Sequence, residues 1–273
     1  MQAFELSSRG EIDIKRMSSG KLQKWYIPEK RLFVKLSTQD GYGGYMSDSL
    51  SEVAISALCG FLGFSQDEYV KYEFCEVSID GTTPVIGCAC ANFLKDGEQY
   101  LPLGKLINPS LYFELTRTSG VEQAYKRLVE NLRGYGISDS ERVLERMFLL
   151  DFLTLNKDRH FDNLGVIRGL DETFGMAPIF DNGGGFWGDM IIDDTEVSYL
   201  VENSVSKPFC VKFDDTARLI NPENIADLRI DNADFEKYIN ELENAELVNP
   251  QKTEKIKEIL KNRLDRLKTL GIG

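Results

Sequence analysis

Two polar loops, each lying directly after a strongly apolar stretch, constrain the fold of this chain more than any other feature. The first loop, residues 155–163 (LNKDRHFDN), follows the apolar segment 146–153, and the second loop is residues 178–183 (PIFDNG). The apolar density of segment 146–153 predicts a buried helix. A loop anchored on such an element can hold its side chains at fixed positions, as the chemistry of a functional site requires.

Three side chains in these loops have the order and spacing of a phosphoryl-transfer site. Asp158 and Asn163 are separated as in the protein-kinase pattern H-R-D-x-x-x-x-N, where the aspartate accepts the proton of the attacking hydroxyl and the asparagine binds magnesium. Asp181 takes the place of the D-F-G aspartate, which also binds metal. Because Mg²⁺ usually takes only one or two ligands from the protein, Asn163 and Asp181 are predicted metal ligands and Asp158 a catalytic residue.

Each motif alone is equally compatible with a simpler structure. Residues 158–160 (DRH) would then be a charged turn at the end of a helix, and residues 181–183 (DNG) a hairpin turn. Their order along the chain, together with a strand lysine and a glycine-containing turn near the N-terminus, favours phosphoryl transfer.

The motif N-K-D-R-H-F-D-N, followed by A-P-I-F-D, resembles the HipA-like serine/threonine kinase family, whose best-known members are bacterial toxins paired with antitoxins. The D-R-H-x-x-N string is also similar to that of phosphoinositide kinases, which share the distant protein-kinase-like fold. By motif the resemblance extends from about Ser18 to Asp181. It implies a protein kinase that uses ATP and Mg²⁺ and acts on a translation component such as an aminoacyl-tRNA synthetase. It also implies an antitoxin or a small, separately encoded partner.

Length and charge narrow the class of protein. A chain of 273 residues is long enough for a two-lobed enzyme, and 42% hydrophobic with 28% charged residues is ordinary for a globular protein. A formal net charge of −12 argues against a broad nucleic-acid-binding surface, which is normally basic. We therefore expect no direct contact with nucleic acid.

Cysteine usage and hydropathy bear on the compartment. The five cysteines include no C-x-x-C pair, which suits a reducing cytosol better than a disulfide framework or a zinc site. No run approaches the roughly 20 apolar residues of a membrane span, and the opening stretch has no apolar region of a signal peptide. We expect a cytoplasmic protein that does not bind a membrane.

The N-terminal part is predicted to form two strands joined by a turn, and Gly20 lies just before the first strand. Strands are predicted at 22–27 and 31–36, joined by a turn at 28–30. This is the layout of a loop that covers nucleotide phosphates, so backbone amides near Gly20 and the ammonium group of Lys21 are predicted to bind phosphate. A tight hairpin with a solvated Lys21 is the alternative.

The string SGKLQK (residues 19–24) is similar to a short motif of HipA-like kinases, in which a serine and a glycine precede glutamine and lysine. It has one residue more between the glycine and the glutamine than that motif. In this family a serine just ahead of the glycine can be autophosphorylated, which switches the enzyme off. The resemblance therefore implies that role for Ser18 or Ser19.

Lys35 lies on a predicted strand, because it ends the apolar alternation of Leu32 and Val34. The next helix is predicted to begin at Ser49, with Glu52 in its first turn. A strand lysine followed by such a glutamate matches the kinase Lys–Glu ion pair, which directs the lysine to the α- and β-phosphates. Alternatively, Glu52 is a favourable first-turn charge in a capping box with Ser49, and both interpretations can hold at once.

Two further strands are predicted at 70–79 and 85–94, with an edge strand through Ile12 and Ile14. Together with the first pair they would form a small antiparallel sheet with one helix.

The predicted hinge to the second lobe is residues 92–97. In the protein-kinase-like fold the adenine base bonds to the backbone of the hinge. Asn92 and Phe93 are therefore candidate nucleotide contacts.

Beyond about residue 102 the pattern is helical. Helices are predicted at 120–132 and at 138–155, the second one opening with the capping-box string S-D-S-E. The tail, residues 221–273, is helical and charged, with an apolar stripe. Its default role is packing against the lobe.

A hairpin of strands 164–167 and 176–180 is predicted to deliver Asp181 to the same site as Asn163. The glycine-rich stretch that follows, residues 183–194, is where an activation segment would lie, because glycine permits unusual backbone angles.

These elements predict an α+β, two-lobed protein-kinase-like fold. Residues 1–94 would form the N-lobe with its small antiparallel sheet. Residues 95–273 would form a mainly helical C-lobe that carries the catalytic loop 156–163 and the metal loop 178–185.

Arg159 and His160 complete the predicted catalytic set, each with an alternative. Arg159 would stabilise charge on the transferring phosphoryl group or pair with a phosphorylated loop, and an internal salt bridge is the alternative. His160 is the only histidine of the chain. A histidine of this motif takes part in catalysis in phosphoinositide-kinase-like sites, whereas the aspartate has the main part in HipA-like kinases. A structural role is the alternative for His160.

Two other classes of function stay open. The first is a non-catalytic nucleotide-binding or interaction module, against which the intact set of Lys35, Asp158, Asn163 and Asp181 weighs. The second is an enzyme that phosphorylates a lipid or a small molecule, because the sequence does not reveal the acceptor pocket.

Overall fold

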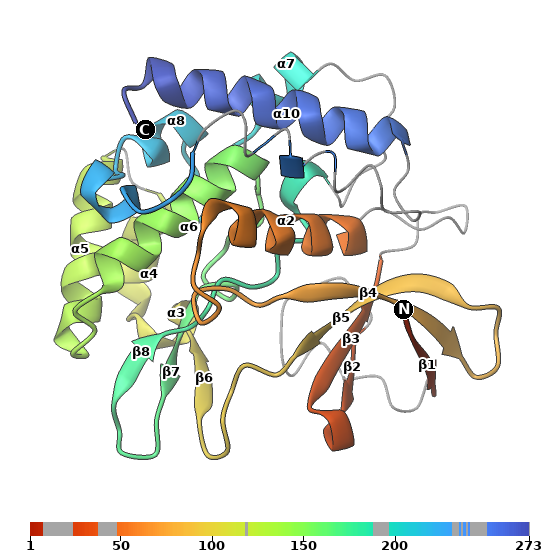
Figure 1. Ribbon diagram of the computed structural model, residues 1–273. Coiled ribbons are helices and arrows are strands. Elements are labelled where there is room, and N and C mark those ends of the chain that lie inside the picture. The colour runs from red at the N-terminus through yellow and green to blue at the C-terminus, as the bar shows by residue number, and fades with distance from the viewer. Residues whose placement is uncertain are drawn as a thin grey trace.

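The computed structural model places a five-stranded sheet beside a mainly helical part (Figure 1). The structure describes residues 1–7, 24–37, 48–117, 120–187, 197–230, 235, 237, 238, 240 and 250–272. The strand predicted through Ile12 and Ile14, the predicted phosphate loop with Ser18, Ser19, Gly20 and Lys21, and residues 188–194 of the predicted activation segment lie outside the described residues.

The larger sheet has the strand order β1-β4-β5-β3-β2. Apolar alternation predicts the strands from Lys24 onward, with ends that differ by a few residues. The strand at Gln2–Leu6 is missed, because residues 1 to about 16 look polar and irregular in the sequence. Between β2 and β3, a 3-10 turn η2 (Pro28–Lys30) forms the predicted turn. The strands are β1 (Gln2–Leu6), β2 (Lys24–Ile27), β3 (Leu32–Leu36), β4 (Tyr72–Ile79) and β5 (Val85–Ala91).

The prediction of a purely antiparallel sheet is wrong at one edge. Strand β1 runs parallel to β4, with Phe4 opposite Val77, whereas the other neighbouring strands of this sheet are antiparallel. Phe4 is buried against one face of the sheet together with Trp25 and Val34. An apolar pattern shows that a strand has a buried face, but it does not determine whether the strand runs parallel or antiparallel to its neighbour. The mixed character of this sheet could therefore not be predicted from the pattern.

Helix α2 (Asp48–Leu62) lies between the sheet and the helices of the second part (Figure 1). Its side chains Ala54, Ile55 and Leu58 are fully buried and belong to the same core as the helical part. The hydroxyl of Tyr238 donates to the carbonyl of Ala54 at 2.8 Å. Helix α2 therefore packs against the second part, although in the sequence it lies between β3 and β4 of the first part.

The second part contains a small antiparallel sheet, β6-β7-β8, and most of the helices. Helix α6 is its centre, because every residue from Leu144 to Thr154 is buried, as the apolar density predicts. The strands are β6 (Gln99–Pro102), β7 (Gly165–Arg168) and β8 (Phe174–Met176), and the helices are α3 (Leu103–Leu106), α4 (Pro109–Thr116), α5 (Val121–Gly134), α6 (Ser140–Thr154), η3 (Gly185–Trp187), α7 (Val197–Asn203), α8 (Phe213–Ala217), η4 (Pro222–Ile225) and α10 (Pro250–Thr269).

Helix α10 packs along α6 with the apolar stripe that its sequence predicts (Figure 1). Ile256, Ile259 and Leu260 are buried in the common core. Arg263 of the same helix donates from Nε to the carbonyl of Phe152 at 3.1 Å. Within the described residues no helix is both long and apolar enough to cross a membrane.

Two local predictions in this part are wrong. The capping box at the start of α6 does not form, because the N-cap is Asp139 and no side chain caps the helix. Strand β8 ends at Met176, and Ile179 instead pairs with the connection before β4, accepting from Val70 N at 2.9 Å and donating to Glu68 O at 2.8 Å. The segment that leads to Asp181 is thereby joined to the first part of the chain.

Gly87 offers a test of how tightly β3 is held. A Cβ atom on Gly87 of β5 would lie 2.5 Å from the carbonyl oxygen of Lys35 and 3.2 Å from a methyl group of Leu36. Gly87→Ala should therefore lower the free energy of unfolding by about 1–3 kcal/mol, measured by denaturant unfolding.

Gly134→Ala, at the end of α5, is the matched control, because nothing lies within 4 Å of a Cβ there. It should be neutral or stabilising by up to about 1 kcal/mol. Equal unfolding curves for the two variants would contradict the close contact between β5 and β3.

Candidate active site

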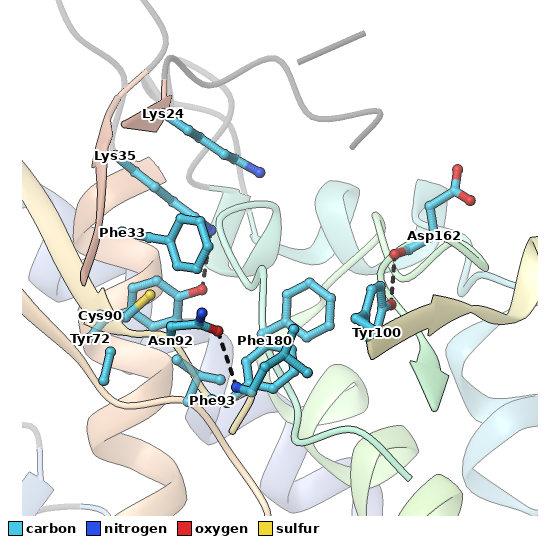
Figure 2. Close-up of a pocket in the computed structure, with 13 residues that line it drawn as sticks. Lys24, Phe33, Lys35, Tyr72, Cys90, Asn92, Phe93, Tyr100, Asp162 and Phe180 are labelled. Atoms are coloured by element: carbon cyan, nitrogen blue, oxygen red, sulfur yellow. Dashed lines mark hydrogen bonds between the residues drawn. The ribbon is translucent and has the colours of Figure 1, made fainter. Parts of the chain in front are cut away.

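A buried ion cluster joins the sheet to the loop that follows β8. Lys35 Nζ lies 2.6 Å from Glu52 Oε1 of α2 and 2.8 Å from Asp181 Oδ1. It also donates to the hydroxyl of Tyr72 at 3.1 Å (Figure 2). The structure thus brings together the strand lysine, the helix glutamate and the predicted metal ligand. Asp181 has a left-handed backbone with φ 58°, a conformation that aspartate tolerates better than most residues.

Burial and charge compete in setting the pKa of each member of this cluster. Burial alone would raise the pKa of Asp181, but the ammonium groups of Lys35 and Lys24 outweigh it and hold that pKa well below its usual range. Burial likewise would lower the pKa of Lys35, but Asp181 and Glu52 raise it well above 10.5. For Glu52 burial dominates and raises the pKa despite Lys35. The Lys35 ammonium and the Asp181 carboxylate are therefore both charged at neutral pH.

Glu52 serves the ion pair and not a helix cap. Its Oε1 binds Lys35, and its Oε2 accepts from the backbone N–H of Asn182 at 2.7 Å. Ser49 lies within α2, where its N–H donates to Ser37 Oγ at 3.1 Å. The capping-box interpretation of Ser49 and Glu52 is therefore wrong.

Arg159 is the residue that ties the two loops to each other. Its guanidinium is fully buried and pairs with Asp151 of α6, with both contacts at 3.1 Å. One nitrogen, Nη1, donates to the carbonyl of Asn163 at 3.3 Å and to that of Phe180 at 2.6 Å. The carbonyl of Asn163 and that of Phe180, the residue before Asp181, therefore share one donor, which joins the two loops that carry the predicted metal ligands.

This geometry decides between the roles that the sequence left open for Arg159. Burial would lower the pKa of its guanidinium, but Asp151 outweighs burial and raises it. Its side chain also donates to Asn182 Oδ1. With these partners inside the protein, Arg159 forms the internal salt bridge and positions other residues, and its prediction as a catalytic group in contact with phosphate is corrected.

Asp158 lies on the same loop with its side chain half exposed. Its N–H donates to Asn156 Oδ1 at 3.2 Å, and Asn156 in turn donates to Asp151 at 3.0 Å. His160 Nε2 lies 3.9 Å from Asp158 Oδ2, beyond a good hydrogen bond, and its Nδ1 accepts from the N–H of Asp162. The structure thus fixes the backbone at Asp158. The carboxylate pairs with Lys207 Nζ at 2.8 Å and stays half exposed, so an acceptor can reach it from outside.

Asn163 and Asp181 offer oxygen atoms of the kind that Mg²⁺ bound together with phosphate would require, and in this structure both Asp181 oxygens contact lysines. Asn163 donates from Nδ2 to the carbonyl of Asp158 at 3.2 Å, which leaves its amide oxygen Oδ1 available as a ligand. Among the described residues there is no group of three or more histidine, cysteine, aspartate or glutamate side chains that could hold a metal without help. A hard cation that draws its remaining ligands from phosphate and water matches such a sparse set.

An aromatic pocket opens beside the ion cluster (Figure 2). The rings of Phe93 and Phe180 lie 5.6 Å apart, and Tyr100 meets Phe180 edge-on at 5.3 Å. Burial raises the pKa of the Cys90 thiol to about 11. The two predicted nucleotide contacts in the hinge both line this pocket. Its lining consists of Lys24, Phe33, Lys35, Val70, Tyr72, Cys90, Ala91, Asn92, Phe93, Leu94, Tyr100, Asp162 and Phe180.

Of the three hinge N–H groups at residues 92–94, one has no acceptor within the described residues. The N–H of Asn92 donates to the carbonyl of Arg31 at 2.8 Å, and the N–H of Leu94 donates to the side chain of Asn92 at 3.1 Å. The N–H of Phe93, between them, has no protein acceptor in the described part of the chain. A flat base with an acceptor nitrogen fits this arrangement.

Lys24 is a site residue that sequence reasoning missed. It lies on β2 directly opposite Lys35, and its Nζ is 3.6 Å from Asp181 Oδ2. Burial lowers its pKa from 10.5, against the opposing effect of Asp181. The sequence predicts Lys21 as the phosphate-binding lysine, and Lys21 lies outside the described residues. The register of the β2–β3 hairpin is the signal that would have identified Lys24.

Comparison with known proteins places the chain among kinase-like folds. No protein-family model and no curated protein sequence matches it. Among solved structures it is similar to the Helicobacter pylori proinflammatory kinase CtkA, with a TM-score of 0.65, 16% sequence identity, and coverage of 98% of this chain and 96% of that chain. It is also similar to the structure of hydra Fam20 with sugar, with a TM-score of 0.49, 12% identity, and coverage of 91% and 80%, a level that supports no conclusion.

The chain therefore has a kinase-like fold, which it shares with CtkA. The predicted two-lobed α+β fold is confirmed, apart from the parallel edge strand β1. Because the identity of 16% shows the fold alone, membership of the HipA-like family stays a prediction, as does the lobe boundary at residues 94 and 95.

The joining role of Arg159 can be measured as stability. Arg159→Met would leave Asp151 buried without its cation and free the carbonyls of Asn163 and Phe180. It should lower the free energy of unfolding by about 3–5 kcal/mol in denaturant unfolding.

Arg133→Met is the control, since Arg133 pairs with Glu141 on the surface. Exposed pairs contribute at most about 1 kcal/mol. A loss of similar size in both variants would show that Arg159 does not join the loops.

Proposed function

We propose that this protein is an ATP- and Mg²⁺-dependent protein kinase that transfers the γ-phosphoryl group of ATP to a serine or threonine hydroxyl. The observation that carries the proposal is the Lys35–Glu52–Asp181 cluster at the end of an aromatic pocket. Asp158 lies on a loop that Arg159 holds against the loop of Asp181. A kinase needs little covalent chemistry from the protein, so positioning and charge are the main requirements.

The pocket supports binding of the nucleotide base and its phosphates. Aromatic rings such as those of Phe93 and Phe180 bury a flat ring well, and the free N–H of Phe93 matches an acceptor on adenine. Lys35 and Lys24 would exchange part of their contact with Asp181 for contact with the phosphates. Both lysines lie on neighbouring strands and face the same end of the pocket.

Asn163 and Asp181 would hold the metal, and when bound it would neutralise phosphate charge. Asp158 would orient the acceptor hydroxyl and accept its proton. The half-exposed position of the Asp158 carboxylate suits this role, because the acceptor has to reach it from outside.

The resemblance to HipA-like kinases supports a translation component, such as an aminoacyl-tRNA synthetase, as the protein acceptor in the cytoplasm. It also supports autophosphorylation at Ser18 or Ser19 and an antitoxin or small, separately encoded partner. Incubation with γ-labelled ATP and Mg²⁺ tests the class of function. Label on this chain or on a protein supports the proposal, label on phosphoinositides indicates a lipid kinase, and no label at any metal concentration indicates a non-catalytic module.

Asp158→Asn tests the assigned proton acceptor. The variant should lower the rate of phosphoryl transfer by about 10²–10⁴-fold, because the acceptor proton loses its base. ATP binding, measured by calorimetry, should be unchanged, since Asp158 does not line the pocket.

Asp171→Asn is the control, because Asp171 lies on the β7–β8 turn and bonds to Thr173. It should transfer phosphate at the wild-type rate. Full activity of Asp158→Asn would rule out Asp158 as the proton acceptor.

The lowered pKa of Lys24 predicts a pH dependence of ATP binding. As pH rises, the free protein loses the Lys24 proton at a pH below 10.5, so binding of phosphate then requires uptake of a proton and becomes weaker. Lys35 does not contribute in this range because its pKa is raised. The measurement is the dissociation constant of ATP as a function of pH.

Lys24→Arg keeps its charge at alkaline pH and should retain its affinity there. The same pH dependence in the wild-type protein and in Lys24→Arg would exclude Lys24 as a phosphate contact.

A further inference from the structure

A lysine from a distant part of the chain lies at the predicted catalytic aspartate. Lys207 Nζ is 2.8 Å from Asp158 Oδ1. No sequence motif singles out Lys207, and 49 residues separate it from Asp158. Only the fold brings Lys207 and Asp158 together.

The loop that carries Lys207 is fixed to the core. The N–H of Ser206 donates to the carbonyl of Val211 at 2.7 Å, and the N–H of Val211 donates back at 3.3 Å. Phe209 is buried, and its ring meets that of Phe148 of α6 at 5.9 Å. The backbone of Lys207 is therefore held in place relative to α6, the helix that also leads into the loop of Asp158.

Stability does not account for the ion pair. The side chains of Lys207 and Asp158 are 36% and 47% exposed. An ion pair with this exposure contributes at most about 1 kcal/mol, and fixing a long lysine side chain costs conformational entropy of similar size. A fixed loop places the ammonium group of Lys207 beside the partly exposed carboxylate of Asp158. This arrangement indicates that the ammonium group binds a ligand.

The cations of the site are divided between its two ends. Lys35 and Lys24 both contact Asp181, at the end where the metal and the inner phosphates would lie. Lys207 contacts Asp158, at the end where the acceptor would enter. During phosphoryl transfer, negative charge is spread over the oxygens of the group that passes between these ends, and fixed cations stabilise it.

We propose that Lys207 is a further catalytic residue, whose ammonium group donates to an oxygen of the transferring phosphoryl group. This inference rests on the proposed kinase function. The acceptor oxygen forms a bond to the γ-phosphorus, the bond from the γ-phosphorus to the bridging oxygen of ADP breaks, and the acceptor proton passes to Asp158. Asp158 thereby becomes neutral, so Lys207 loses its ionic partner and turns its hydrogen bond to the phosphate while it keeps its own proton.

Lys207→Met tests the role by comparing binding with turnover. It should lower kcat by about 10²-fold, as the loss of one stabilising donor typically does, while the dissociation constant of ATP and the melting temperature stay at wild-type values. Lys207→Arg should retain part of the activity. Lys212→Met is the matched control, because Lys212 donates to the carbonyl of Glu202 and belongs to neither loop of the site; it should be fully active.

Chemical rescue separates a direct role from a structural one. Ethylammonium added to Lys207→Ala should restore part of kcat, because Lys207 is partly exposed and a small cation can take its place. Rescue should be absent in Asp158→Asn. Wild-type kcat in Lys207→Met, or an equal loss in Lys212→Met, would overturn the assignment.

A binding measurement distinguishes failure of this inference from failure of the proposed function. ADP with Mg²⁺ and aluminium fluoride mimics the transferring group, and the wild-type protein should bind it more tightly than ADP with Mg²⁺ alone. Lys207→Met should lose that gain. A gain that persists in Lys207→Met overturns the role of Lys207 and leaves the kinase function standing, whereas a wild-type protein that binds no nucleotide overturns both.

Discussion

Buried cations that bind more than one element hold the site of this protein together. Lys35 of the sheet binds Glu52 of α2 and Asp181 of the helical part, and Arg159 binds Asp151 and the backbones of both loops. A buried charge is tolerated only when it is paired and hydrogen-bonded. The arrangement that satisfies these charges is also the arrangement that aligns the site, so the two parts of the chain cannot separate at this point without exposing unpaired ions.

The parts of the site that the sequence predicts are those that local pattern determines. Lys35 ends an apolar alternation, and Glu52 follows at the start of the next helix, so both can be placed from their neighbours alone. The spacing of Asp158 and Asn163 lies within one loop, and the apolar stretch before it forms the buried helix α6. Short-range patterns of this kind survive folding because packing reinforces them.

Features set by long-range contact could not be predicted in the same way. The parallel direction of β1 depends on its pairing with β4, and the importance of Lys24 depends on the register that sets it opposite Lys35. Lys207 comes from a loop whose position follows from the burial of Phe209. In each case the structural role depends on a partner that is distant in the sequence.

The proposed function requires that oxygen ligands from two loops and a lysine from the sheet converge on one bound nucleotide and metal. The most direct measurement is a crystal structure of the protein with Mg²⁺ and a non-hydrolysable ATP analogue. We predict a metal ion held by Asn163 and Asp181, phosphates within reach of Lys35, and the base against Phe93. A nucleotide bound outside this pocket, or a metal ion that contacts neither Asn163 nor Asp181, would contradict the account.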